Sequence, residues 1–182
     1  MFEFRFHGRG GQGAVTSAEL LAQAAIAHGQ FAQAFPSFGP ERRGAPVVAF
    51  ARIDKQQIRN RTAVSTPNVV IVLDPSILRI ANTSDGLQEG GFQIVNTKRK
   101  ADELKKEFGL KGKLVTVDAN TIAAEEIGRV ITNTTMLGAL VRATDILPRE
   151  LIVEALKERF GRIAQGNIKA FTRAYEECVC ER

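Results

Sequence analysis

The sequence predicts a three-layer α/β domain with a mainly parallel sheet and a helical C-terminal third, spanning residues 1–182. Two observations carry this prediction. Strand-like and helix-like patterns alternate along the chain, an order typical of a sheet with helices packed on its faces. Short runs of branched apolar residues, such as Val69 to Leu73, are typical of strands buried on both faces of a parallel sheet. The expected architecture is therefore Rossmann-like.

The first element is a strand followed by a glycine-rich turn and a helix. Between Phe2 and Phe6, phenylalanines alternate with Glu3 and Arg5, a period of two that predicts a half-buried strand. After the glycines, apolar residues between Val15 and Ile26 recur at spacings of three and four, which predicts a helix ending near Gly29. The chain therefore opens with a strand, glycine turn, helix unit.

The later elements follow from the same periodicities. Residues 36–46 hold three of the six prolines, so they form neither a helix nor a central strand. The polar run 132–135 is typical of a helix N-cap, and the tail carrying Cys178 and Cys180 is expected to be exposed and frayed. Strands are predicted over 31–35, 47–53, 69–73, 92–95 and 114–117, and helices over 101–108, 121–127, 135–144, 148–160 and 167–177.

Composition narrows the class of function. A net charge of +5 without arginine-rich clustering argues against nucleic-acid binding. No apolar run approaches the roughly 20 residues of a membrane span, and the N-terminus enters a strand directly, so we expect a cytoplasmic protein. Two cysteines separated by one residue do not enclose a metal, and no nucleophile motif or metal-spaced set is present, so we predict no catalytic and no metal-binding residues.

The glycine turn is the first candidate site. It fits the pattern G-x-G-x-x-G between a strand and a helix, where backbone N–H groups can approach an anion. Binding of NAD also calls for an acidic residue about 20 positions later, and residues 30–35 contain none. Three hypotheses remain: a stand-alone NAD(P)-binding Rossmann domain, glycines that merely permit tight strand–helix packing, or a loop that touches an anionic group or a partner chain. The candidate binding residues here are Gly8, Arg9, Gly10, Gly11, Gln12 and Gly13.

The second candidate is a proline- and glycine-rich loop. Its adjacent arginines beside a glutamate suit phosphate or carboxylate, because guanidinium offers a fixed fork of donors. The alternative is a salt-bridge network between chains. If the first two strands run parallel, both loops leave the same end of the sheet, where such folds bind ligands. The candidate binding residues here are Gly39, Pro40, Glu41, Arg42, Arg43 and Gly44.

Long stretches of the chain resemble a known family. Residues 7–15 and 33–47 resemble the γ subunit of pyruvate:ferredoxin oxidoreductase, which is also the γ domain of related 2-oxoacid:acceptor oxidoreductases. The resemblance continues through residues 69–75, 133–139 and 166–171, so it covers nearly the whole chain. The sequence of residues 38–46 resembles the pyruvate branch of this family more than its 2-oxoglutarate or branched-chain 2-oxoacid branches.

The resemblance implies a complex that oxidatively decarboxylates pyruvate to acetyl-CoA and passes electrons to ferredoxin. Thiamine diphosphate, Mg²⁺, 4Fe-4S clusters and coenzyme A then belong to the complex, mainly to its other subunits. The chain lacks the C-x-x-C-x-x-C cluster motif and a thiamine–magnesium motif, so we expect it to bind no cofactor alone and not to be catalytic alone. The implied partners are α, β and δ subunits and, through the complex, ferredoxin. Within it, the chain would dock on thiamine-binding subunits and help form the coenzyme A approach, with Arg9, Arg42 and Arg43 contacting anionic groups.

Overall fold

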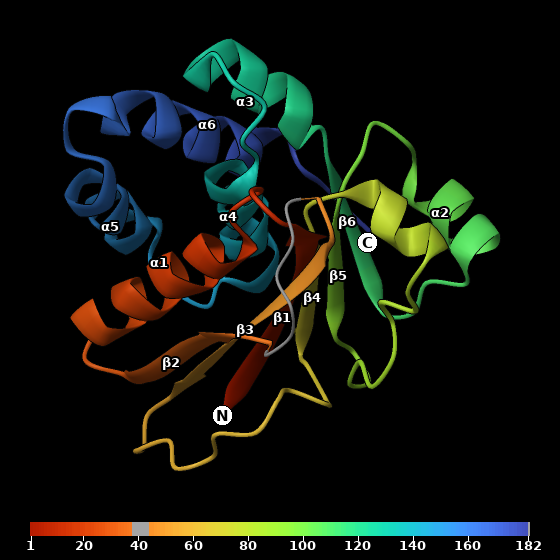
Figure 1. Ribbon diagram of the computed structural model, residues 1–182, viewed down its shortest axis with the longest axis horizontal. Helices are drawn as coiled ribbons and strands as arrows, with labels where there is room; N and C mark the ends of the chain where they lie inside the picture. Colours follow the sequence, from red (N-terminus) through yellow and green to blue (C-terminus); the bar gives the residue numbers. More distant parts are fainter. Residues whose placement is uncertain (38–43, 182) are drawn as a thin grey trace.

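The computed structural model describes residues 1–37 and 44–181. Within them, seven strands form one sheet in the order β2-β3-β1-β4-β5-β6-β7 (Figure 1). The strands are β1 (Phe2–Arg9), β2 (Phe31–Pro36), β3 (Pro46–Asp54), β4 (Val69–Val72), β5 (Phe92–Asn96), β6 (Lys113–Val117) and β7 (Val179–Cys180).

Most of the strands share one direction. β1, β4, β5 and β6 lie side by side and parallel. β3 lies between β1 and β2 and is antiparallel to both, so β2 points the same way as β1 without touching it. β7 runs antiparallel to β6. The predicted α/β class with a mainly parallel sheet is confirmed, and β3 separates the first two strands.

The helices cover both faces of this sheet. In Figure 1, α1, α4, α5 and α6 lie on one side of the sheet and α2 on the other. Every predicted helix is present, with ends within a few residues of those expected. The helices are α1 (Ala14–Ala27), α2 (Ala101–Phe108), α3 (Ala119–Ile127), α4 (Asn133–Thr144), α5 (Arg149–Phe160) and α6 (Ala164–Glu177), with 3-10 turns η1 (Pro75–Arg79) and η2 (Gly161–Ile163). None of the helices in the described part of the chain is long and apolar enough to cross a membrane.

Strand β4 shows the three layers directly, because alternate side chains of a strand point to opposite faces. Val69 and Ile71 belong to the large core formed with α1, α4, α5 and α6. Val70 and Val72 belong to a smaller cluster that includes Leu104 of α2. Both faces of the strand are buried, as its continuous apolar run predicts.

The prediction that β1 is half-buried is wrong, because its polar face is buried too. Glu3, Arg5 and His7 are each less than a tenth exposed. The segments between β3 and β4 and between η1 and β5 cover them. Arg5 donates from Nη2 to the carbonyl oxygens of Thr83 (3.0 Å) and Asp85 (2.5 Å) in the second of these segments. A period of two indicates which residues share a face of a strand, but it does not indicate whether a distant segment covers that face.

The C-terminal tail is exposed at Val179 and Cys180, as predicted, but the prediction that it is frayed is wrong. Val179 and Cys180 form β7 and pair with β6, where Cys180 lies opposite Val115. Glu181 then accepts hydrogen bonds from Leu114 N (3.0 Å) and from Lys105 Nζ (2.7 Å). The pairing joins segments more than 60 residues apart, and nothing local in the sequence indicates it.

Candidate functional site

The glycine loop and the Gly44 end of the second loop meet at the carboxyl end of β1. Arg9, the last residue of β1, pairs with Pro46, the first of β3. Gly10 N donates to Ala45 O (2.9 Å), and Gly44 N donates to Gly10 O (3.2 Å). The glycine loop and the end of the second loop are therefore neighbours, at the sheet edge where α/β folds bind ligands. Gly39, Pro40, Glu41, Arg42 and Arg43 lie outside the described residues.

Gln12 closes the glycine loop. Its side-chain Oε1 accepts from Arg9 N (2.7 Å), and its backbone N–H donates to Arg9 O (3.0 Å). Its Nε2 donates to Asp74 Oδ2 (2.9 Å), just beyond the end of β4. Gln12 thus holds the loop in one shape and ties it to the neighbouring strand.

Arg9 joins three segments at this edge. Its Nε lies 3.2 Å from Asp74 Oδ2, its Nη1 donates to Gly44 O (3.0 Å), and its Nη2 donates to Ser76 Oγ (2.7 Å). Partial burial acts to raise the pKa of Asp74, but hydrogen bonds from Ser76 and Gln12 and the charge of Arg9 hold that pKa below its usual value. The positive charge of Arg9 is therefore paired within the chain and positions the loops.

Gly13 forms a close junction between α1 and α4. It has φ +79°, and a Cβ at this position would lie 2.6 Å from Asn133 Nδ2. Ser17 Oγ donates to Asn133 O (3.2 Å), which holds the starts of the two helices together. Both the left-handed backbone and the lack of space call for glycine. The packing hypothesis accounts for this glycine, while the first turn of α1 keeps N–H groups that no side chain caps.

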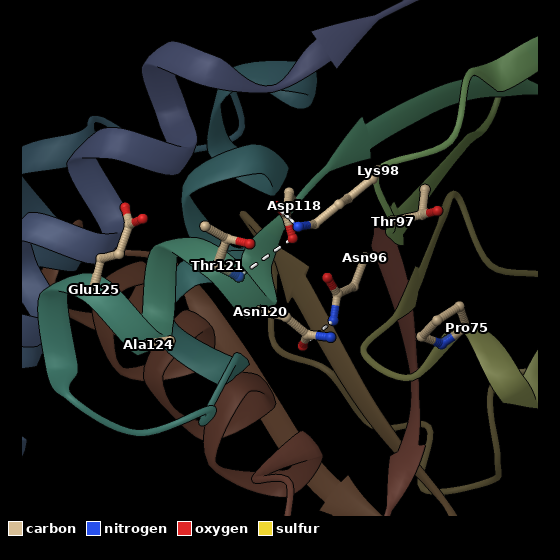
Figure 2. Close-up of a pocket in the computed structure, with 9 residues that line it drawn as sticks. All are labelled: Pro75, Asn96, Thr97, Lys98, Asp118, Asn120, Thr121, Ala124 and Glu125. Carbon is tan, nitrogen blue, oxygen red and sulfur yellow. Dashed lines mark hydrogen bonds and ion pairs between the residues drawn. The ribbon is translucent and has the colours of Figure 1, made fainter.

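A cavity of about 500 Å³ opens along the same edge (Figure 2). It lies at the carboxyl ends of β5 and β6, between the starts of η1 and α3. Lys98 Nζ lies 3.3 Å from Asp118 Oδ2, and Asp118 Oδ1 accepts from Thr121 N (3.2 Å) at the start of α3. The lining residues are Pro75, Asn96, Thr97, Lys98, Asp118, Asn120, Thr121, Ala124 and Glu125.

Asn96 supplies the buried polar floor of this cavity. Its side chain is 2% exposed, and its Nδ2 donates to Leu73 O (2.8 Å) and Asn120 Oδ1 (2.9 Å). Figure 2 shows its amide oxygen pointing away from Asn120 into the cavity. Burial acts to raise the pKa of Asp118, but hydrogen bonds from Thr121 and Lys98 keep it below its usual value. The cavity thus presents a cation, a carboxylate and amide groups.

Sequence reasoning missed this cavity. Lys98 belongs to neither candidate site of the sequence, and it lies before α2 and beside Asp118. The positions of two polar residues in the sequence could have indicated this cavity. Asn96 and Asp118 come directly at or after the ends of two apolar runs, and the carboxyl ends of parallel strands meet at one sheet edge.

The sheet order argues against the stand-alone dinucleotide-binding hypothesis. Dinucleotide-binding folds place a parallel second strand next to the first, with the acidic ribose-binding residue at its end. Here the neighbour of β1 on that side is the antiparallel strand β3, and β2 is one strand further away. The glycine pattern is therefore present without the strand arrangement that normally accompanies it.

The remaining reactive side chains do not gather at this edge. His7 Nε2 accepts from Arg5 Nε (3.1 Å), and burial together with the charge of Arg5 lowers the pKa of His7 to about 4. Burial and the nearby Cys180 raise the pKa of Cys178 to about 12. Within residues 1–37 and 44–181, no three His, Cys, Asp or Glu side chains cluster in a way that could hold a metal ion.

Comparison with known proteins gives a consistent result. Residues 3–177 match the family model described as pyruvate ferredoxin/flavodoxin oxidoreductase. The chain is 51% identical to the pyruvate/ketoisovalerate oxidoreductases common subunit gamma of Thermococcus litoralis, over 98% of both chains. It is also similar to the crystal structure of pyruvate oxidoreductase subunit PORC from Thermotoga maritima, with TM-score 0.89, 42% identity and coverage of 100% and 98%.

A more distant structure shares the fold alone. The 2-oxoglutarate:ferredoxin oxidoreductase from Magnetococcus marinus, solved with 2-oxoglutarate, coenzyme A and succinyl-CoA bound, matches with TM-score 0.75 and 19% identity. The match covers 96% of this chain and 30% of that one. The resemblance carried by residues 7–15 and 33–47 is confirmed by the closer relatives. The chain belongs to the pyruvate ferredoxin/flavodoxin oxidoreductase family, as a γ-type subunit of a 2-oxoacid oxidoreductase.

Proposed function

We propose that this chain is the γ subunit of a pyruvate:ferredoxin oxidoreductase (pyruvate synthase), where it docks on the thiamine-binding subunits and helps form the approach of coenzyme A. One observation carries the proposal. The glycine loop, the Gly44 end of the second loop and the cavity beside Lys98 all lie at the carboxyl edge of one sheet. This is the edge at which such folds bind ligands.

The chemistry of this edge suits the phosphates of coenzyme A. Lys98 is largely exposed, and Asp118 is its one carboxylate partner among residues 1–37 and 44–181, so its ammonium group keeps donors for a second anion. The uncapped first turn of α1 carries the positive end of a helix dipole. Arg42 and Arg43, immediately before Gly44, are further candidates. The Magnetococcus enzyme, which shares this fold, was solved with coenzyme A bound.

The network around Arg9 supports the docking role. It ties the glycine loop, Gly44 and the Asp74–Ser76 turn together. A surface whose segments are fixed in advance loses less conformational entropy when it binds a partner. We propose α, β and δ subunits as those partners, with thiamine diphosphate, Mg²⁺ and 4Fe-4S clusters held mainly by them, and ferredoxin as the electron acceptor of the cytoplasmic complex.

A second candidate is a branched-chain 2-oxoacid:ferredoxin oxidoreductase. The Thermococcus litoralis relative is described as a subunit common to pyruvate and ketoisovalerate oxidoreductases. A subunit shared in this way would leave the choice of 2-oxoacid to its companions. The 2-oxoglutarate enzyme is a third candidate, supported by fold similarity alone.

Isolation of the tagged chain from its native source tests the assignment. We expect companion chains that carry thiamine diphosphate and iron–sulfur clusters, and ferredoxin reduction that requires coenzyme A and pyruvate. Comparing pyruvate, 2-oxoisovalerate and 2-oxoglutarate as substrates separates the three candidates. A chain that always elutes alone would contradict the proposal, and micromolar calorimetric binding of NAD or NADP would favour the stand-alone alternative.

Kinetics of the assembled complex test the coenzyme A role. A phosphate contact made by a charged donor contributes about 1.5 kcal/mol or more, so Lys98→Ala is expected to raise the KM for coenzyme A about tenfold. The pair Arg42→Ala and Arg43→Ala is expected to act in the same direction, with the KM for pyruvate unchanged. Lys106→Ala, on the exposed face of α2, is the matched control. If the KM for coenzyme A is unchanged while the complex stays intact, the coenzyme A role is contradicted and only the docking role remains.

A further inference from the structure

Strand β2 lies at one end of the sheet, with β3 as its neighbour on one side. No other described strand pairs with its outer side. An open strand edge is a template for another extended chain, and proteins commonly shorten or cover such edges. Here the strand spans six residues, and Phe31 at its start is 48% exposed. The β2 edge is therefore available for pairing.

The register identifies the backbone groups that point outward. Ser37, just after β2, donates from its backbone N–H to Val48 O (2.7 Å), so the backbone of Ser37 faces β3. Phe35 lies two residues before Ser37 and is paired with Phe50 of β3. In an antiparallel ladder the residues alternate between bonding to the neighbour and pointing away from it. Odd-numbered residues of β2 thus bond to β3, while Ala32 and Ala34 turn their N–H and C=O groups to the free side.

A groove runs beside this edge. Its volume is about 460 Å³, and it is lined by Gln33, Ala34, Phe35 and Arg61. Gln33 Nε2 donates to Ile58 O (3.1 Å), which holds the segment after β3 next to β2. The groove therefore combines the apolar side chains of Ala34 and Phe35 with Arg61, and Ala34 is one of the two residues with outward-pointing backbone groups.

The segment beside the groove is cationic. Lys55, Arg59 and Arg61 are exposed, and none of them has a carboxylate within 4.0 Å among the described residues. The carboxylate of Asp54, close in sequence, is paired with the N-terminal amino group of Met1 at 3.0 Å. Three uncompensated cations beside an open strand edge favour an acidic partner, because interface charges are arranged to be complementary.

We propose that the β2 edge and its groove bind an extended acidic segment of a partner protein, which joins the sheet as an additional strand. Backbone hydrogen bonds to Ala32 and Ala34 would supply affinity, as in other cases of strand addition. Acidic side chains of the segment would reach Arg59 and Arg61, and apolar ones would contact Phe35. This surface is the lateral edge of the sheet, formed by β2, whereas the proposed coenzyme A site lies at the carboxyl ends of the strands. The two proposals therefore concern different surfaces.

Amide exchange of the full 182-residue chain, measured by NMR, tests the proposal. The probe is a synthetic peptide of about eight residues that alternates Glu and Val, the length of an ordinary strand. The same peptide with Lys in place of Glu is the control. We expect the Glu peptide to slow exchange at Ala32 and Ala34 at least about tenfold, with little change at Gln33 and Phe35, whose amides already bond to β3.

A charge-reversal pair tests the electrostatic part. Arg59→Glu with Arg61→Glu is expected to weaken binding of the Glu peptide at least about tenfold. Lys106→Glu with Lys111→Glu is the matched control, because it changes the net charge equally on an exposed surface away from β2. Circular dichroism checks that both variants remain folded.

Several outcomes would overturn the proposal. Equal binding of the Glu and Lys peptides would remove the specificity for acidic partners, and unchanged exchange at Ala32 and Ala34 would remove the strand addition. Equal affinity of the charge-reversal pair and its control would remove the role of Arg59 and Arg61. Protection of the β2 edge that appears without peptide and grows with protein concentration would identify it as an interface between copies of this chain instead.

Discussion

The two faces of strand β1 are almost equally buried, but they are built from opposite chemistry. Phe4 and Phe6 are fully buried and pack into the large core. On the other face, Glu3, Arg5 and His7 are less than a tenth exposed. The apolar face is stabilised by the area it removes from water, and the polar face depends on each buried group finding a partner. One face is therefore sensitive to volume and the other to charge.

The partners on the polar face are specific. Arg52 donates from Nε to Glu3 Oε1 at 2.7 Å, and the Arg52 side chain is 1% exposed. Arg52 also donates to the carbonyl oxygens of Asn60 and Thr62, which belong to the covering segment. This face is thus closed by directional bonds between a strand and a long connection, and it tolerates the loss of a single partner poorly.

Glu3→Leu gives the largest expected effect, because it leaves the buried charge of Arg52 without its carboxylate. Removing one partner of a buried ion pair costs about 3–5 kcal/mol, and urea unfolding of the purified chain measures it. Phe6→Leu on the opposite face keeps the apolar character and most of the volume, so it is expected to cost less than about 1.5 kcal/mol. Equal losses in the two variants would break the contrast between the faces.

The next effect is a loss of stability in mild acid caused by His7. Its pKa is lowered from 6.5 to about 4 in the folded chain, so the unfolded chain binds the proton more readily. The contribution of His7 is fully present above pH 6.5 and falls as the pH drops towards 4, by about 3 kcal/mol in total.

Unfolding titrations at pH 7, 6, 5 and 4 measure this slope. His7→Gln, whose amide oxygen can also accept from Arg5, is expected to flatten it within that window. A slope that survives in His7→Gln would assign the acid sensitivity to another group. Carboxylates with lowered pKa values, such as those of Asp74 and Asp118, add their losses at more acidic pH.

Two glycines of the loop after β1 extend the comparison to the end of the strand. Gly11 has φ +93° with open space around it, whereas Gly13 has φ +79° and faces Asn133. Gly11→Ala is expected to cost about 1 kcal/mol, the penalty of the left-handed backbone alone. Gly13→Ala adds a steric clash and is expected to cost about 2–3 kcal/mol. Thermal unfolding of both variants gives the difference, and equal costs would show that Asn133 moves aside freely.

The smallest effect concerns a second ion pair, between Arg9 and Asp74. Their side chains are 29% and 18% exposed, compared with 1% and 12% for Arg52 and Glu3. Because water screens this pair, Arg9→Gln is expected to cost about 1 kcal/mol. The pKa of Asp74, followed by NMR, should rise modestly, since the hydrogen bonds from Ser76 and Gln12 remain. A loss as large as that of Glu3→Leu would show that burial does not separate the two pairs.

Local pattern predicted most of the fold and part of the site. Helix α2 occupies the predicted range Ala101–Phe108, and the glycine loop lies between β1 and α1 as expected. The sequence predicted that both loops leave the same end of the sheet if the first two strands run parallel, and the Gly44 end of the second loop does lie beside the glycine loop. The cavity beside Lys98 was missed, and so was the pairing of Arg9 with Asp74, since Arg9 ends β1 and Asp74 follows β4, 65 residues further along the chain. The roles assigned to Arg42 and Arg43 stay predictions.

The sequence by itself determined which segments become β1 to β6 and the helices, because apolar periodicity, glycine and proline act over a few neighbouring residues. Tertiary structure alone decided that β3 separates β1 from β2, that β7 joins β6, and that Glu3, Arg5 and His7 are buried. These outcomes depend on contacts between distant segments, and a polar residue in a strand is buried or exposed according to which long connection covers it. The ion pairs of β1 also depend on the tertiary structure, because their partners are close in space but distant along the chain.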